Sequence, residues 1–309
     1  MRRIFLFAVI LLIVLYLTIY IQYRGEIDAA RQRVLDGSSV PSTEYGEIEY
    51  AVEGEGPAVL VIHGAGGGYD QGMLIGKKAL GDGFTIIAVS RFGYLRSPFI
   101  ADSTVEDQAA LYVELLNHLG VEKVIVVGAS AGGPSALQFA HDYPERSSAL
   151  ILLSAVSMFM GDEIPISTIV INTIQRSDFL FWAILKIFRT QFSEMVGIPQ
   201  NLYAELSPED KIYADNMLDY MNPVSPRRPG NIYEAEIRPL SGEAMGGIKV
   251  PTIILHAKDD FLVTYDHAEF VYQNILNAEL VSFESGGHAL VAELSTISAR
   301  INDFLIQND

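Results

Sequence analysis

The segment from Val124 to Gly133 constrains the fold of this chain more than any other. It opens with the apolar, mostly β-branched run VIVV and then changes at once to small residues around one serine, GASAGG. Such a run predicts a strand covered on both faces, and the small residues allow a sharp turn into a helix that accepts Pro134 in its first turn. Gly128 to Gly132 spell G-x-S-x-G, in which the serine hydroxyl stands free at a sheet edge. We therefore predict Ser130 in a strand-to-helix turn, with the Ala131 N–H aimed at an anion.

Other protein families also place a glycine-rich turn between a strand and a helix. A short-chain dehydrogenase needs G-x-x-x-G-x-G, but Pro134 occupies the third glycine position, and no tyrosine has a lysine four residues later. The string GASAGGPSAL also resembles a chemotaxis-type methylesterase, whose catalytic histidine motifs are missing from the sequence. A structural turn with an incidental serine is the remaining alternative, so the rest of the chain has to decide.

Composition narrows the function classes. The 309 residues, 50% of them hydrophobic, can form one large α/β domain or one domain with an insertion. A net charge of -17 argues against nucleic acid as a partner, because such proteins present clustered Lys and Arg. The sequence has no cysteine, which excludes disulfides, thiol catalysis and cysteine metal sites.

The N-terminus predicts a membrane anchor. Ile4 to Tyr23 carries no formal charge and is long enough to cross about 30 Å of hydrocarbon as a helix. No small-residue cleavage site follows, so we expect an uncleaved single-pass anchor over residues 1–23 and not a signal peptide. Arginines flank both ends, and with so short a tail we expect the N-terminus inside and the catalytic domain outside. Residues 24–42 are polar and predict a linker, with a short helical piece at 27–35 as an option.

The rest of the chain alternates between strands and helices. Glu47 to Glu53 predicts a half-buried antiparallel strand with its glutamates outside, and apolar strands are expected at 58–62, 84–89, 148–153, 250–255 and 280–283. Ser103 and Glu106 form a capping box for a helix that ends before Gly120. This order predicts a mostly parallel central sheet with helices on both faces. Its two parts would be residues 43–155 and 248–309.

The alternation is lost between residues 156 and 247. This aromatic-rich segment predicts an inserted helical lid, in which Phe179 to Phe188 is too short to span a membrane. One interpretation is that this stretch forms the hydrophobic core of the lid. An acyl-chain pocket or a membrane-facing patch is the other.

Two further loops carry chemical signals. HGAGGG follows the strand at 58–62, and its glycines let backbone N–H groups point into a cavity. It misses both phosphate-binding glycine patterns, so we predict an oxyanion loop in which the Ala65 N–H, with Gly66 as alternate, pairs with the Ala131 N–H. Among six histidines, His288 alone lies in a glycine-flanked loop after a late strand, which favours it as the base that activates Ser130.

The acid that orients this histidine is expected after the strand at 250–255. Asp259 and Asp260 both lie there, and we prefer Asp260, which is followed by Phe-Leu-Val. The order Ser130, Asp260, His288 is typical of one large fold family.

From about Thr43 to the C-terminus the chain resembles the α/β-hydrolase superfamily, on the strings HGAGGG, GASAGG, HAKDD and SGGHAL. The resemblance implies Ser130 as nucleophile, His288 as base, Asp260 as orienting acid and no metal or organic cofactor. SRFGYLRSP is similar to a stretch of meta-cleavage C–C hydrolases and iminopeptidases but departs from their D-x-P-G pattern. Serine in the turn speaks against haloalkane dehalogenases and epoxide hydrolases, which use aspartate.

The expected function is that of a membrane-anchored serine hydrolase, esterase- or lipase-like (EC 3.1). It would cleave a small ester-like substrate with a hydrophobic acyl group through an acyl-enzyme. A C–C bond hydrolase with the same triad is one alternative. A catalytically silent binding protein on the same fold is another.

Overall fold

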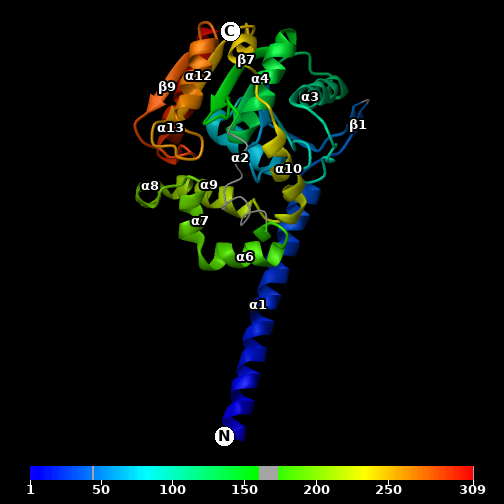
Figure 1. Ribbon diagram of the computed structural model, residues 1–309, viewed down its shortest axis with the longest axis vertical. Coiled ribbons are helices and arrows are strands. Elements are labelled where there is room, and N and C mark those ends of the chain that lie inside the picture. The colour runs from blue at the N-terminus through cyan, green and yellow to red at the C-terminus, as the bar shows by residue number, and fades with distance from the viewer. Residues whose placement is uncertain (44, 160–172, 309) are drawn as a thin grey trace.

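The computed structural model describes residues 1–43, 45–159 and 173–308, and its centre is a twisted sheet (Figure 1). Within these residues seven strands pair in the order β3-β5-β4-β6-β7-β8-β9, with β3 antiparallel to β5 and all other pairs parallel. Their bounds are β3 Tyr50–Glu53, β4 Ala58–Ile62, β5 Thr85–Val89, β6 Val124–Ala129, β7 Ser147–Leu153, β8 Thr252–Ala257 and β9 Glu279–Phe283. A small hairpin, β1 Ser42–Thr43 with β2 Gly46–Glu47, precedes them.

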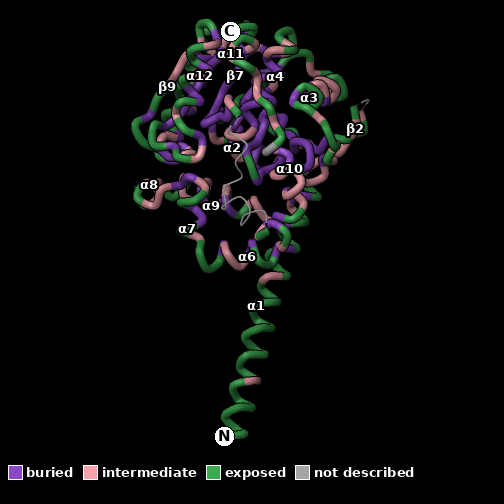
Figure 2. Tube along the Cα trace, in the orientation of Figure 1, coloured by how far each residue is buried: buried purple, intermediate pink, exposed green. Residues whose placement is uncertain are grey.

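Helices cover both faces of the sheet, which confirms the predicted α/β class. One face packs against α3 (Val105–Leu119), α4 (Gly133–Asp142) and α12 (Asp266–Asn274), and the other packs against α2 (Tyr69–Leu80) and α13 (Leu294–Gln307). The central strands β4, β6, β7 and β8 are buried almost throughout, as their apolar runs predict (Figure 2). In a parallel sheet all their carboxyl ends meet at one edge, where the loops with chemical signals also lie.

Helix α2 is an element that the sequence analysis did not predict. Its glycines obscure the helical pattern but serve its packing against the sheet. A Cβ at Gly76 would lie 3.0 Å from Ile86 and 3.1 Å from Val61, and one at Gly72 would lie 3.3 Å from Ala88. Because these positions have no side chain, α2 lies close on β4 and β5, at the usual cost in helix propensity.

Two local predictions were wrong in detail. The capping box of α3 is formed by Thr104 and Asp107, one residue later than expected, because Thr104 is the residue with extended backbone before the first turn. Glu49 was expected to face solvent with Glu47, but it is fully buried. It accepts hydrogen bonds from Ser38 and Ser90 and pairs with Arg96, and these partners offset the cost of burying its charge.

Helix α1 (Arg2–Asp36) is longer than the predicted anchor and includes most of the predicted linker. Ile27, Ala30 and Val34 recur at helical spacing and are buried against the body of the protein. This apolar stripe explains why residues 24–36 continue the helix. The most apolar part of α1 is unburied (Figure 2). Among the described residues, α1 is the one helix that is long and apolar enough to be a membrane span or a signal sequence.

The segment between β7 and β8 contains helices joined by loops and has no strand among its described residues. We call residues 156–247 the lid segment; residues 160–172 of it lie outside the described residues. The α-helices among its described residues are α6 Asp178–Ile187, α7 Arg189–Met195, α8 Gln200–Glu205, α9 Pro208–Asp219, α10 Arg228–Tyr233 and α11 Gly242–Met245. In Figure 1 its helices α6, α7, α8 and α9 lie on the side of the sheet from which α1 leaves, whereas α11 packs against α4 and α12.

Candidate active site

Ser130 occupies the sharp turn that the G-x-S-x-G pattern predicts. It follows β6 directly and has a φ of +50°, in the left-handed region that side chains other than glycine rarely adopt. The turn also passes close to β4, since a Cβ at Gly132 would lie 2.4 Å from the Ile62 carbonyl oxygen. A Cβ at Gly64 would lie 2.9 Å from the Ser130 Cβ. Glycine is therefore required at both positions for Ser130 to reach this conformation.

The structure brings Ser130, His288 and Asp260 into one line of hydrogen bonds. His288 Nε2 lies 2.8 Å from Ser130 Oγ, and His288 Nδ1 lies 2.8 Å from Asp260 Oδ2. The three residues come from the carboxyl ends of β6, β8 and β9. Ser130 and His288 are partly exposed while Asp260 is buried, so the outer end of the line is open to a reactant.

Asp260 lies in surroundings that keep its carboxylate ionised. Its Oδ1 accepts hydrogen bonds from the Leu262 and Val263 N–H groups, at 2.9 and 3.0 Å. Burial alone would raise the pKa of Asp260, but hydrogen bonds from His256 and His288 hold the pKa well below its ordinary value. A buried carboxylate of this kind fixes the Nδ1–H tautomer of His288 and leaves Nε2 free to accept a proton.

Asp259, the alternative acid, does something different. It is exposed, and its carboxylate accepts hydrogen bonds from the Gly287 N–H at 2.9 Å and the Gly286 N–H at 3.3 Å. Asp259 therefore holds the loop that carries His288, while Asp260 touches the imidazole itself.

The two predicted oxyanion segments lie beside Ser130. The Gly66 N–H, the alternate donor, is already bonded to Asn231 Oδ1 at 2.7 Å, which favours Ala65 as the donor of this loop. Arg91 donates to the Ala131 carbonyl oxygen at 3.0 Å and so holds the turn after Ser130. Each segment is thus fixed by a neighbouring polar side chain.

Sequence reasoning missed the cluster that supplies these side chains. It consists of Arg91, Tyr94, Asn231 and Glu234, the last two from the lid segment. Arg91 and Tyr94 are fully buried and both contact Glu234, and the Tyr94 hydroxyl oxygen lies 2.7 Å from Asn231 Oδ1, so its one proton is placed between two acceptors. Burial raises the pKa of Tyr94 well above its ordinary value, which keeps the hydroxyl a neutral donor. The arginine and tyrosine within SRFGYLRSP are the sequence signal that could have indicated this cluster. No local pattern around Asn231 indicates that it belongs to it.

His63 and His256, the other histidines that end strands, brace loops around the site. Burial lowers the pKa of His63 well below its ordinary value. The neutral ring lies with Nδ1 2.6 Å from the Gly64 carbonyl oxygen and accepts the Arg91 N–H at Nε2. His256 Nε2 lies 2.8 Å from the Val263 carbonyl oxygen and 3.3 Å from Asp260 Oδ2.

The lid segment lies directly against the site. Gly197, at φ +80°, has no room for a side chain, because a Cβ there would lie 2.2 Å from the His288 Cβ. The Ala289 N–H donates to the Gly197 carbonyl oxygen at 3.2 Å. Met221 packs against the loop that carries Gly66. The lid segment therefore helps to set the position of the imidazole.

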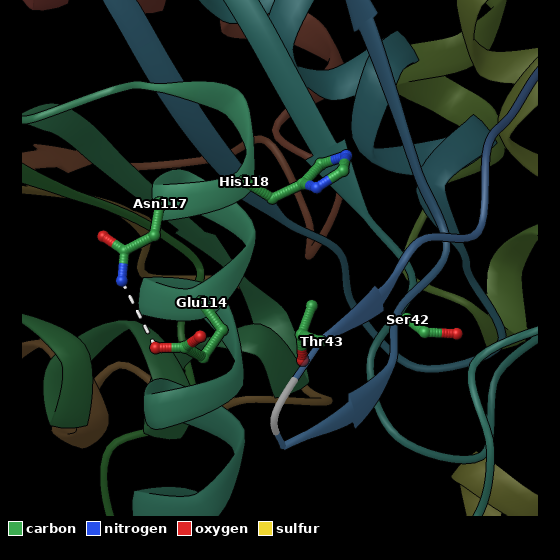
Figure 3. Close-up of a pocket in the computed structure, with 5 residues that line it drawn as sticks. All are labelled: Ser42, Thr43, Glu114, Asn117 and His118. Carbon is green, nitrogen blue, oxygen red and sulfur yellow. Dashed lines mark hydrogen bonds between the residues drawn. The ribbon is translucent and has the colours of Figure 1, made fainter.

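A surface hollow elsewhere shows no comparable chemistry. Figure 3 shows its lining, formed by Ser42, Thr43, Glu114, Asn117 and His118 between the small hairpin and α3. None of these side chains belongs to the line through Ser130. Within the described part of the chain, no group of three or more His, Asp or Glu side chains could hold a metal ion.

Comparison with known proteins places the chain in a family. Residues 57–293 match the α/β hydrolase fold family. The uncharacterized hydrolase YcgS of Bacillus subtilis is 28% identical over 263 residues, which cover 79% of this chain and 89% of that protein. A 2-hydroxy-6-oxo-6-phenylhexa-2,4-dienoate hydrolase of Burkholderia cepacia is 26% identical over 254 residues, 76% of this chain and 82% of the relative. An α/β hydrolase fold protein from Nakamurella multipartita superposes with a TM-score of 0.71 at 26% identity. The superposition covers 87% of this chain and 98% of that protein.

The chain belongs to the α/β hydrolase fold family, and it is a hydrolase that acts on a small molecule. This confirms the resemblance drawn from HGAGGG, GASAGG, HAKDD and SGGHAL.

Proposed function

We propose that this hydrolase cleaves carboxylic esters or related acyl bonds through an acyl-enzyme, with Ser130 as nucleophile, His288 as base and Asp260 as the orienting acid. The observation that carries the proposal is the hydrogen-bonded line from Ser130 Oγ through His288 to Asp260, with 2.8 Å at each step. A serine hydroxyl becomes a useful nucleophile when a positioned base takes its proton and a third group orients the base.

The geometry supports a two-stage reaction. Ser130 Oγ attacks the substrate carbonyl carbon while its proton passes to His288 Nε2. The resulting oxyanion would be stabilised by the N–H groups of Ala65 and Ala131, each contributing about 10²- to 10³-fold in rate. His288 then gives the proton to the leaving alcohol, which leaves the acyl group on Ser130. In the second stage His288 removes a proton from water, and the resulting hydroxide attacks the acyl-enzyme carbonyl. The acid is released as the proton returns to Ser130 Oγ. This chemistry needs no metal or organic cofactor.

We also propose that α1 is an uncleaved single-pass anchor that leaves the catalytic body outside the cytoplasm. Its helix continues without a break from the apolar part into residues that pack on the body, among them Ile27 and Val34. Arg33 further ties it to Asp70 of α2 at 3.1 Å. A segment so integrated into the fold supports retention more than removal.

A second candidate is hydrolysis of a C–C bond next to a ketone. The named activity of the Burkholderia cepacia relative favours it. The same three residues would serve, so the two candidates differ in the substrate and not in the nucleophile.

Covalent labelling of the full chain tests the proposal. A fluorescent fluorophosphonate should label wild type on the peptide that carries Ser130, and Ser130→Ala should lose the label and about 10⁶-fold in kcat. Ser282→Ala, at an exposed serine on β9, should keep both and is the matched control.

A substrate panel then separates the candidates. Esters of increasing acyl length should be hydrolysed with rising kcat/KM if the acyl group is hydrophobic, whereas turnover of dienoate ketones alone would favour the C–C reaction. A wild-type chain that takes no label and turns over neither class would contradict the enzyme proposal and favour a silent binding protein.

A further inference from the structure

Helix α6 of the lid segment is apolar on both of its sides. Phe181, Trp182 and Leu185 are buried: Phe181 and Leu185 lie in a cluster made mainly of other lid-segment side chains, and Trp182 contacts Tyr23 of α1. Phe179, Leu180 and Ile187 are 43%, 41% and 70% exposed. We call these three residues the outer face of α6. A surface helix of a soluble domain is ordinarily polar on its outward side, so this face requires an apolar partner.

The position of α6 indicates what that partner is. Its aromatic rings meet Tyr23 of α1, the last residue of the apolar run, with centroids 5.1 Å away for Phe179 and 5.6 Å away for Trp182. Trp182 Nε1 also donates to Glu26 at 2.8 Å. Helix α6 therefore packs against α1 at the level where the candidate span ends, and Figure 1 shows it at the end of the body from which α1 leaves.

Ion pairs hold the two helices together just beyond this level. Asp178 pairs with Arg31 at 2.8 Å, and Lys186 pairs with Glu26 at 2.8 Å. Polar contacts thus lie on the body side, and the aromatic contacts lie at the level of Tyr23. Trp and Tyr are enriched at the boundary between membrane and water.

We propose that α6 lies in the headgroup region of the bilayer that α1 enters, with its outer face in contact with acyl chains. A helix lying in the interface buries its apolar side about 5–10 Å into the boundary between headgroups and acyl chains. The lid segment would then be attached to the lipid surface by α6 and to the loop of His288 by Gly197. The inference rests on the proposed anchoring by α1 and not on the hydrolytic activity.

Single-cysteine labelling tests the inference directly, because the chain has no cysteine of its own. Ile187→Cys carries an environment-sensitive fluorophore in the full chain, reconstituted into phosphatidylcholine vesicles with and without nitroxide-labelled lipid. Leu12→Cys reports on the anchor. Leu276→Cys is the aqueous control, because it is 80% exposed and lies before β9, at the sheet edge opposite to His288.

Contact with lipid should shift the emission of the label at 187 to shorter wavelength and let nitroxide lipid quench it, as for the label at 12 and unlike that at 276. Quenching at 12 without quenching at 187 would overturn the α6 proposal alone. Quenching at 187 but not at 12 would contradict the anchor and overturn the proposal as stated, because α6 would then reach lipid in a bilayer that α1 does not enter. Quenching at neither would contradict both. A shift at 187 that nitroxide lipid leaves unquenched and that vanishes on dilution with lipid would assign the face to a second copy and overturn the proposal.

Discussion

At the scale of single residues, Asp259 and Asp260 are adjacent carboxylates with different surroundings. Asp260 is buried and bonds to His288 Nδ1, whereas Asp259 is exposed and accepts two backbone N–H groups of the histidine loop. The orientation of the turn at these two residues therefore decides which carboxylate reaches the imidazole.

Asp260→Asn should lower kcat by about 10⁴-fold, because an amide no longer fixes the Nδ1–H tautomer of the imidazole. Asp259→Asn is the matched control. It keeps one acceptor oxygen, and a single hydrogen bond contributes about 1 kcal/mol, so its loss should stay within about tenfold. Steady-state kinetics on one ester check both variants. Equal losses, or a larger loss for Asp259→Asn, would contradict the assignment of the acid.

At the scale of elements, the lid segment and the histidine loop are packed without spare room. Gly197 lies at a positive φ and against the His288 Cβ, so a methyl group there has to move one of the two segments. Asn231 also connects the lid segment to the site, because its side chain accepts a hydrogen bond from the Gly66 N–H. The lid segment is thus part of the frame around Ser130.

Gly197→Ala should lower kcat/KM by about 10²-fold, since a misplacement of about 1 Å at a catalytic group has effects of that size. Gly83→Ala is the control for backbone strain alone. Gly83 also has a positive φ, but a Cβ there meets nothing within 4 Å. Both variants should lose about 1–2 kcal/mol of stability from the left-handed backbone.

Kinetics and thermal melting of the two glycine variants separate strain from displacement. If Gly83→Ala lost as much activity as Gly197→Ala, the effect would come from stability and not from the position of His288.

At the scale of the whole molecule, one buried ion cluster joins three parts of the chain. Asp70 of α2 pairs with the buried Arg227 of the lid segment through two hydrogen bonds of 2.9 and 2.7 Å, and with Arg33 of α1 at 3.1 Å. Arg33 also donates to the carbonyl oxygen of Asn222 at 2.7 Å. Helix α1, helix α2 of the core and the lid segment are therefore coupled at a single carboxylate.

Asp70→Asn should destabilise the protein by about 3–5 kcal/mol, because it leaves the charge of Arg227 buried with no compensating partner. Glu53→Gln removes an exposed partner of Lys77 on the same helix and should change the melting temperature little. Melting of the detergent-solubilised chain measures both. A small effect of Asp70→Asn would show that Arg227 reaches water in solution.

The same carboxylate makes stability depend on pH. Burial would raise the pKa of Asp70, but attraction to Arg227 and Arg33 holds it below its ordinary value of about 3.9. The unfolded chain therefore takes up the proton first, so the stabilisation is complete above about pH 5 and is lost as pH falls through 3.9 toward the folded-state pKa. The melting temperature of wild type should fall more steeply over this range than that of Asp70→Asn. Parallel curves would contradict a lowered pKa.

Much of the site could be predicted from the sequence because it follows from local pattern and strand order. Apolar runs that end in small residues predict buried parallel strands, and such strands bring their carboxyl ends to one edge. Ser130 and His288 each follow a strand of this sheet, so its parallel order brings both residues to the same edge.

Only the tertiary structure decided the features that depend on contacts between distant segments. The glycines of α2 hide a helix until β4 and β5 lie against it, and the buried partner of Asp70 is 157 residues away in the chain. Likewise, no local pattern tells that Glu234 bonds to Arg91 or that Asp260 faces the imidazole while Asp259 faces water. The physical reason is that burial and the pairing of buried charges are set by how the whole chain packs, whereas turns and strands are set by neighbouring residues.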